Sequence, residues 1–82
     1  MTVVAYVMVK ANTGEADRLR DAIAALDGIE SVHIVAGDVD LVAKLEVETT
    51  ADVKEVAADR IQSIDGVEDT QTYIAMDRPA SA

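Results

Sequence analysis

Two short stretches of the chain combine side chains that could bind a small charged molecule. The first is Ala36-Gly37-Asp38-Val39-Asp40, where a glycine that can approach a ligand closely stands beside two carboxylates. The second is Thr70-Gln71-Thr72, whose two hydroxyls share one face if the segment is a strand. A zwitterionic amino acid needs a carboxylate for its ammonium group, and N–H or hydroxyl donors for its carboxylate.

The same stretches also suit a plainer interpretation. A hairpin turn with solvated aspartates would contain a Gly-Asp pair, and threonines are common in strands for their β-propensity alone. The residues by themselves leave both interpretations open.

Other kinds of chemistry have little support in the sequence. Nucleophilic catalysis needs Ser or Cys beside an oriented His. The chain has no cysteine, and its single histidine, His33, falls inside a strand-like run. The spacings of zinc ligands, of an EF-hand loop and of a Gly-rich phosphate loop are all missing. We therefore predict a protein that is not an enzyme, with no catalytic residue, metal site or cofactor.

Hydrophobic periodicity and turn residues predict the elements that must position these stretches. Alternating and continuous apolar runs predict strands, and apolar residues at helical spacing predict two amphipathic helices. In order, we expect strand 3–10, helix 15–27, strand 31–36, strand 41–47, a helix capped at Thr49 or Thr50 and running to about residue 63, and strand 67–76. This βαββαβ order is typical of the α+β, ferredoxin-like fold with a four-stranded antiparallel sheet. We expect one domain over residues 1–77 and a flexible tail over 78–82.

A six-residue phrase occurs twice, as "LDGIES" at 26–31 and "IDGVED" at 64–69. Each copy follows a predicted helix and leads into a predicted strand. The repeat is therefore interpreted first as the turn that each half of the split βαβ fold requires.

The first strand is apolar on both alternating sets, which is typical of a strand covered on both faces. Two helices can cover only one face of a four-stranded sheet. We therefore expect a second copy to cover the other face, as a homodimer that packs sheet against sheet with the helices outside.

Sixteen acidic residues oppose seven basic ones, which gives a net charge of −9. Such a surface repels phosphate backbones, so we expect no direct nucleic-acid binding. It also predicts adaptation to molar salt, where the Debye length falls to about 3 Å and self-repulsion is screened. No signal peptide or membrane span is evident, so a cytoplasmic protein without membrane contact is expected.

The stretch "VHIVAGDVDLVAKLEVET", a helix and then "IDGVEDTQTYIAM" resemble the effector-binding (RAM) domain of the Lrp/AsnC transcriptional regulators. The resemblance covers about residues 4–76. It implies sheet-mediated dimers that assemble into octamers or similar rings, with an amino-acid effector bound between dimers at a Gly-x-x-Asp loop. Gly37 and Asp40 match that loop and Thr70 and Thr72 match a terminal Thr-x-Thr, while Asp38 lies inside the loop and is a further ligand candidate.

Full-length members of that family carry an N-terminal DNA-binding domain, and this sequence starts at the first strand, so a stand-alone effector domain is expected. Its partners would be an amino acid, further copies of itself and full-length Lrp/AsnC regulators. Three functions stay open: an oligomeric amino-acid sensor, an interaction module that joins such regulators without binding a small molecule, and, last, a small enzyme of the dimeric α+β barrel type that would depend on His33.

Overall fold

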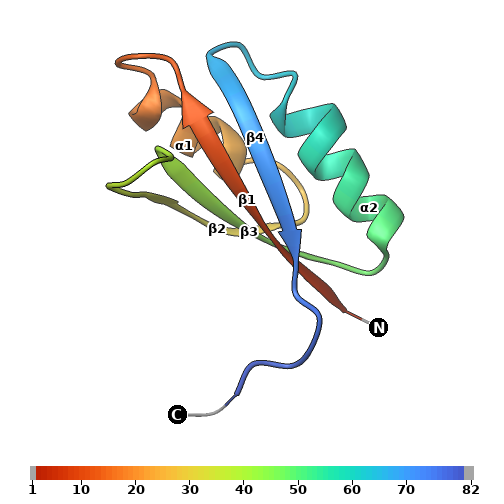
Figure 1. Cartoon of the computed structure of the whole chain (residues 1–82). Helices are drawn as coiled ribbons and strands as arrows, with labels where there is room; N and C mark the ends of the chain where they lie inside the picture. Colours follow the sequence, from red (N-terminus) through yellow and green to blue (C-terminus); the bar gives the residue numbers. More distant parts are fainter. Residues whose placement is uncertain (1, 81–82) are drawn as a thin grey trace.

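The computed structural model describes residues 2–80 and shows one sheet with two helical segments (Figure 1). In chain order the elements are β1 (Val3–Ala11), α1 (Ala16–Ala24), β2 (Ile29–Ile34), β3 (Leu41–Val47), α2 (Thr50–Lys54), its direct continuation η1 (Glu55–Ile61), and β4 (Val67–Ile74). Every neighbouring pair of strands is antiparallel, in the order β2-β3-β1-β4. The predicted ferredoxin-like βαββαβ fold is thus confirmed. Residues 81–82 of the predicted tail lie outside the described residues.

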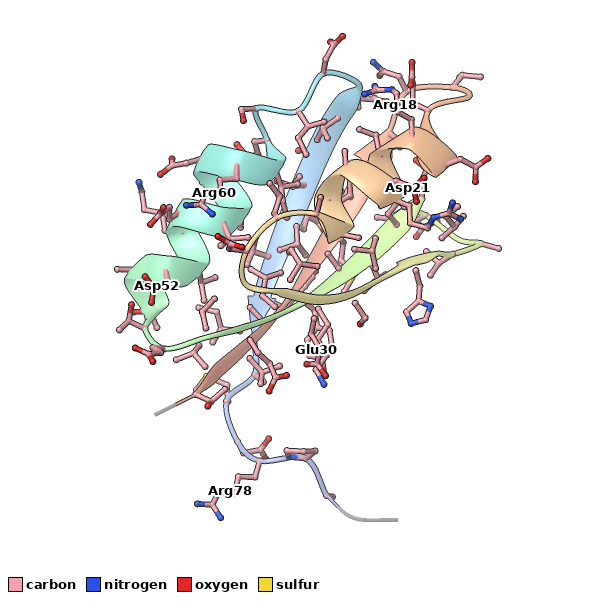
Figure 2. The ribbon with its side chains drawn as sticks, turned by 180° about the vertical axis from the view of Figure 1, so that it is seen from behind. Arg18, Asp21, Glu30, Asp52, Arg60 and Arg78 are labelled. Atoms are coloured by element: carbon pink, nitrogen blue, oxygen red, sulfur yellow. The ribbon has the colours of Figure 1, made fainter. Side chains whose placement is uncertain are left out.

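Both helical segments lie on the same face of the sheet, as Figure 2 shows from behind. Between them and the sheet lies the core, because alternate residues of the two central strands point inward. Its members include Ala5, Val7, Val9, Leu41, Ala43 and Leu45 from the strands, and Leu19, Ile23, Val53, Val56, Ala57 and Ile61 from the helices. The apolar spacing that predicted the helices is therefore the spacing of the residues they bury.

The second helix begins at a capping box. The Thr49 hydroxyl accepts a hydrogen bond from Asp52 N at 3.1 Å, and Asp52 Oδ2 accepts one from Thr49 N at 3.2 Å. From Glu55 onward the helix widens to π-type winding, which the sequence did not predict. Two ion pairs at a spacing of five residues lie there: Lys54–Asp59 at 3.8 Å and Arg60–Glu55 at 2.7 Å. In an α-helix, side chains face one another at spacings of three and four, so these pairs fit the wider winding.

The repeated phrase forms two equivalent turns. Ile29 N donates to Leu26 O and Val67 N donates to Ile64 O, and the glycines Gly28 and Gly66 both have left-handed backbones, with φ of 92° and 102°. The Gly28 carbonyl accepts from Glu46 N, and the Gly66 carbonyl accepts from Asn12 N. The repeat therefore closes each half of the fold in the same way. The first of these turns also ends α1 at Ala24, three residues before the predicted end.

The other face of the sheet has no helix over it (Figure 1). Val4 and Met8 are half-buried there, and two tyrosines that are direct cross-strand partners, Tyr6 and Tyr73, are 37% and 55% exposed. In the single chain the second apolar set of β1 is thus uncovered, as the sequence predicted. We call this surface, formed by the outward residues of the four strands, the open sheet face.

Candidate functional site

The loop between β2 and β3 is held against the end of β1 by one residue, Asp40. Its backbone N–H donates to Val9 O and its carbonyl accepts from Val35 N, both at 2.9 Å. Its carboxylate accepts a hydrogen bond from Ala11 N at 2.8 Å. The pairing of β1 with β4 shifts register between Lys10 and Ala11, and Asp40 satisfies the Ala11 N–H at this irregularity. Asp40 is therefore an anchor that places the loop beside β1.

The tip of that loop is free of close contacts. A Cβ built on Gly37 would meet no atom within 4 Å, and Asp38 is exposed. The Gly37 φ of 159° is close to extended backbone, and no non-glycine residue in 2–80 has a positive φ. Gly37 therefore leaves open space beside the loop, and Asp38 projects its charge at the loop tip.

A shallow depression of about 250 Å³ lies where this loop meets the sheet. Its lining residues belong to the end of β1, the β2–β3 loop and the start of β4, which lie at the end of the sheet away from both chain termini (Figure 1). The lining residues come from β1, the loop and β4, and they are Met8, Lys10, Asp38, Val39, Asp69, Thr70 and Gln71. We call it the loop depression. It combines one ammonium group, two carboxylates, an amide and two apolar side chains, which is the mixed lining that orients a small polar ligand.

The two threonines of the Thr-x-Thr stretch share a face, as predicted, but it is the helix-covered face. Thr70 is the direct partner of Val9 and Thr72 of Val7, and both valines are fully buried beneath the helices. The Thr70 hydroxyl accepts a hydrogen bond from Gln62 Nε2 at 2.7 Å, which directs it toward η1. Of the five predicted ligand residues, Asp38 and Thr70 line the loop depression, and Gly37, Asp40 and Thr72 do not.

Five lining residues were not among the predicted ligand residues: Met8, Lys10, Val39, Asp69 and Gln71. Met8 and Gln71 are direct cross-strand partners, and so are Lys10 and Asp69. Directly opposed residues of an antiparallel pair project to the same side. Aligning the first and last strands of the predicted fold would have shown these pairs, because β1 and β4 are neighbours in every ferredoxin-like sheet of this order.

Other hollows in the described part of the chain include one beside the helices and one near the chain termini. One of about 180 Å³ lies on the helix side, beside the Gly28 turn, and its Arg60 is already bonded to Glu55. The other, of about 860 Å³, lies where the segment after β4 leaves the sheet. Within residues 2–80 no three His, Asp or Glu side chains are placed to hold a metal ion.

One pair of carboxylates on the open sheet face interacts directly. A hydrogen bond with Glu30 raises the pKa of Glu46, and the same contact lowers the pKa of Glu30. Lys44 Nζ lies 3.4 Å from Glu30 Oε2, which favours the charged form of Glu30. The two acids thus share a proton more readily than isolated ones. Figure 2 shows Glu30 on the side of the sheet away from the helices.

None of the described helices has the length and apolarity to cross a membrane. Similarity to known proteins is extensive. The leucine-responsive regulatory protein of Haemophilus influenzae is 29% identical over 77 residues, which is 94% of this chain and 46% of that protein. An uncharacterized HTH-type transcriptional regulator of Pyrococcus abyssi is 32% identical over 60 residues, 73% of this chain and 40% of its own length. The chain thus spans about half the length of the curated relatives it matches.

Solved structures agree on the fold. A protein of Thermus thermophilus superposes with a TM-score of 0.91 at 29% identity, over 96% of this chain and 99% of that one. A transcriptional regulator of Neisseria meningitidis, solved as a complex with L-Met, superposes with a TM-score of 0.82 at 15% identity, over 96% of this chain and 53% of that one. The family model of the Lrp/AsnC ligand binding domain matches residues 4–82. The chain therefore belongs to the Lrp/AsnC ligand-binding domain family.

Proposed function

We propose that the chain is a non-enzymatic effector domain that binds an amino acid in the loop depression and self-associates through the open sheet face. The observation that carries the proposal is the loop depression itself, where a lysine and two aspartates surround a space open to solvent. A lysine suits the carboxylate of an amino acid and an aspartate suits its ammonium group. The L-Met complex of the Neisseria regulator, which has the same fold, supports this ligand class.

In this proposal the predicted ligand residues have different tasks. Asp38 lines the depression with its side chain. Thr70 lies at its edge with its hydroxyl turned to Gln62, and Asp40 keeps the loop in place through Ala11 N. Gly37 keeps the loop tip clear, since nothing lies within 4 Å of the position of its missing Cβ. Thr72 supports the outer strand on the helix-covered face rather than contacting the ligand.

Self-association is supported by the uncovered sheet face, with its exposed tyrosine pair. The chain exposes 5416 Å², whereas a compact monomer of its mass exposes about 4,700 Å². The chain therefore exposes about 700 Å² more than such a monomer. The uncovered sheet and the extended segment after β4 both contribute to this excess. A second copy that stacks its sheet on this one would cover the exposed tyrosine pair.

Charge also favours the open sheet face as the contact. Beside the tyrosine pair this face carries Lys44 against Glu30 and Glu46, a net charge of −1 in a chain of −9, whereas Lys10 and Asp69 lie at the end that holds the loop depression and stays open. The rest of the surface carries most of the repulsion. We expect association to strengthen between about 0.1 M and 1 M salt, as the Debye length falls from about 10 Å to about 3 Å. Light scattering at both salt concentrations measures this, and an unchanged mass would remove the salt argument.

The test is a thermal-shift screen of the twenty amino acids, with the mass of the assembly measured in parallel. A ligand at 100 times its Kd should stabilise the protein by about 2.7 kcal/mol, which such a screen detects. A shift for at least one amino acid supports a sensor. A stable oligomer without any shift would instead favour the alternative function, an interaction module that joins full-length Lrp/AsnC regulators, and mixing with such a regulator would then be the next step.

A further inference from the structure

The charged groups of the loop depression form few polar contacts with residues 2–80. Among the described residues, every lysine and arginine of the helices and sheet forms an ion pair within 4.0 Å except Lys10. Asp69 Oδ1 accepts from Thr70 N at 2.9 Å, which fixes the orientation of that carboxylate and leaves Oδ2 without a hydrogen bond to any residue in 2–80. Asp38 is exposed at the loop tip and bonds to no described residue. The depression therefore presents one cation and two anions to a ligand.

The number of these charges is informative about the ligand. An α-amino acid brings one carboxylate, which Lys10 can meet, and one ammonium group, which one aspartate can meet. The second aspartate then has no partner on an amino acid whose side chain is uncharged. A ligand with a cationic side chain supplies it, and the complex becomes locally neutral.

The apolar lining fits the same ligand. Met8 is half-buried, and Val39 lies in the loop between the two aspartates of the Gly-x-x-Asp stretch. The side chains of lysine, ornithine and arginine have a methylene stem that packs on apolar surface while the charged end stays near water. A small anionic side chain has no methylene stem to pack on this lining and no cation for the second aspartate, and the aspartates repel its charge.

Resting on the proposed function, we propose that the effector is an amino acid with a cationic side chain. Lys10 binds its α-carboxylate, one of Asp38 and Asp69 binds its α-ammonium group, and the other binds the side-chain cation. One additional charge pair at a partly exposed site strengthens binding by about tenfold. L-Arginine or L-lysine should therefore bind about tenfold tighter than L-norleucine, which has a similar stem without the charge, and L-glutamate should bind most weakly.

Isothermal titration of the full chain with these four amino acids at about 0.1 M salt measures the preference. The variants are Lys10→Met, Asp38→Asn and Asp69→Asn. The matched control for the two aspartate variants is Asp65→Asn, which makes the same change in net charge as they do, outside the depression. Circular dichroism and the Tm of each variant verify folding. We expect Lys10→Met to weaken all bound amino acids, and one of Asp38→Asn and Asp69→Asn to abolish the tenfold preference while norleucine binding stays within about twofold. Asp65→Asn should change neither.

The contrary outcomes are distinct. Norleucine that binds as tightly as arginine would overturn the cationic ligand while leaving the proposed function intact. Arginine binding that Asp65→Asn weakens as much as both depression variants would show a general attraction to the acidic surface, and would also overturn the inference. No binding of any of the twenty amino acids would overturn the inference together with the proposed function.

Discussion

Replacing Asp40 with alanine tests whether this residue anchors the loop that forms one wall of the depression. The variant removes the carboxylate that accepts a hydrogen bond from Ala11 N at 2.8 Å in a partly buried position. It leaves the N–H without that acceptor, at the point where the β1–β4 pairing is irregular. Hydrogen bonds to charged groups contribute about 1.5–3 kcal/mol to stability. We therefore expect Asp40→Ala to lower the free energy of unfolding by about 2 kcal/mol.

In thermal terms this is a large change for so small a domain. One kcal/mol corresponds to roughly 4–8 °C in Tm for domains of 60–100 residues, so the Tm should fall by about 8–16 °C. Urea unfolding followed by circular dichroism, at one fixed protein concentration, gives the free energy directly. Asp40→Asn keeps an oxygen acceptor of the same shape and should lose about half as much as Asp40→Ala, because a neutral acceptor forms a weaker bond.

The matched control is Asp38→Ala. Asp38 lies in the same loop and carries the same charge, but it is exposed and bonds to no described residue. Its replacement should change stability by no more than about 0.5 kcal/mol. If Asp40→Ala costs no more than Asp38→Ala, Asp40 does not anchor the loop, and its carboxylate would be available as a direct ligand.

Three further predictions concern single contacts. The Glu30–Glu46 contact raises the pKa of Glu46. Its contribution to the free energy of unfolding is therefore complete below the unfolded-state pKa of about 4.3, and it is lost as the pH rises through the folded-state pKa. Glu46→Gln should therefore raise the Tm at pH 7 and leave it nearly unchanged at pH 4; an equal shift at both pH values would contradict the shared proton. Thr49→Ala removes the hydroxyl of the capping box and should cost about 1 kcal/mol in urea unfolding, whereas Thr50→Ala, one residue on, should cost much less. Gly28→Ala should lower the free energy of unfolding more than Gly14→Ala. Both glycines have positive φ, but a Cβ at Gly28 would lie 3.0 Å from Val47 Cγ1, whereas one at Gly14 would meet nothing within 4 Å. Equal losses in urea unfolding would show that the contact with Val47 has no effect.

Much of the fold could be predicted because its determinants are local. The inward residues of β3 alternate strictly, and its predicted bounds of 41–47 agree with the structure. The two "DG" turns were predictable because glycine adopts positive φ without a steric penalty, and both glycines have positive φ in the structure. The π-type segment of the second helix could not be predicted, since its residues have the same apolar spacing as an ordinary amphipathic helix.

The sequence predicted only some of the residues that line the loop depression, and the reason is physical. The outer strand β4 is mostly exposed on both sides, so its own pattern does not tell which residues face the helices. That choice is made by its register with β1, which places Thr70 opposite the buried Val9 and Asp69 opposite Lys10. The role of Asp40 depends on a partner 29 residues away, Ala11 N, which no local pattern reveals.

The most direct test of the account is to locate the bound amino acid. Two-dimensional ¹H–¹⁵N NMR spectra of the chain, recorded during titration with L-arginine, report on each backbone N–H. The account predicts that the largest shifts fall in residues 8–11, 38–40 and 69–71, which surround the loop depression. Shifts that fall instead around the helix-side hollow beside Gly28, or the absence of any saturable shift with all twenty amino acids, would contradict it.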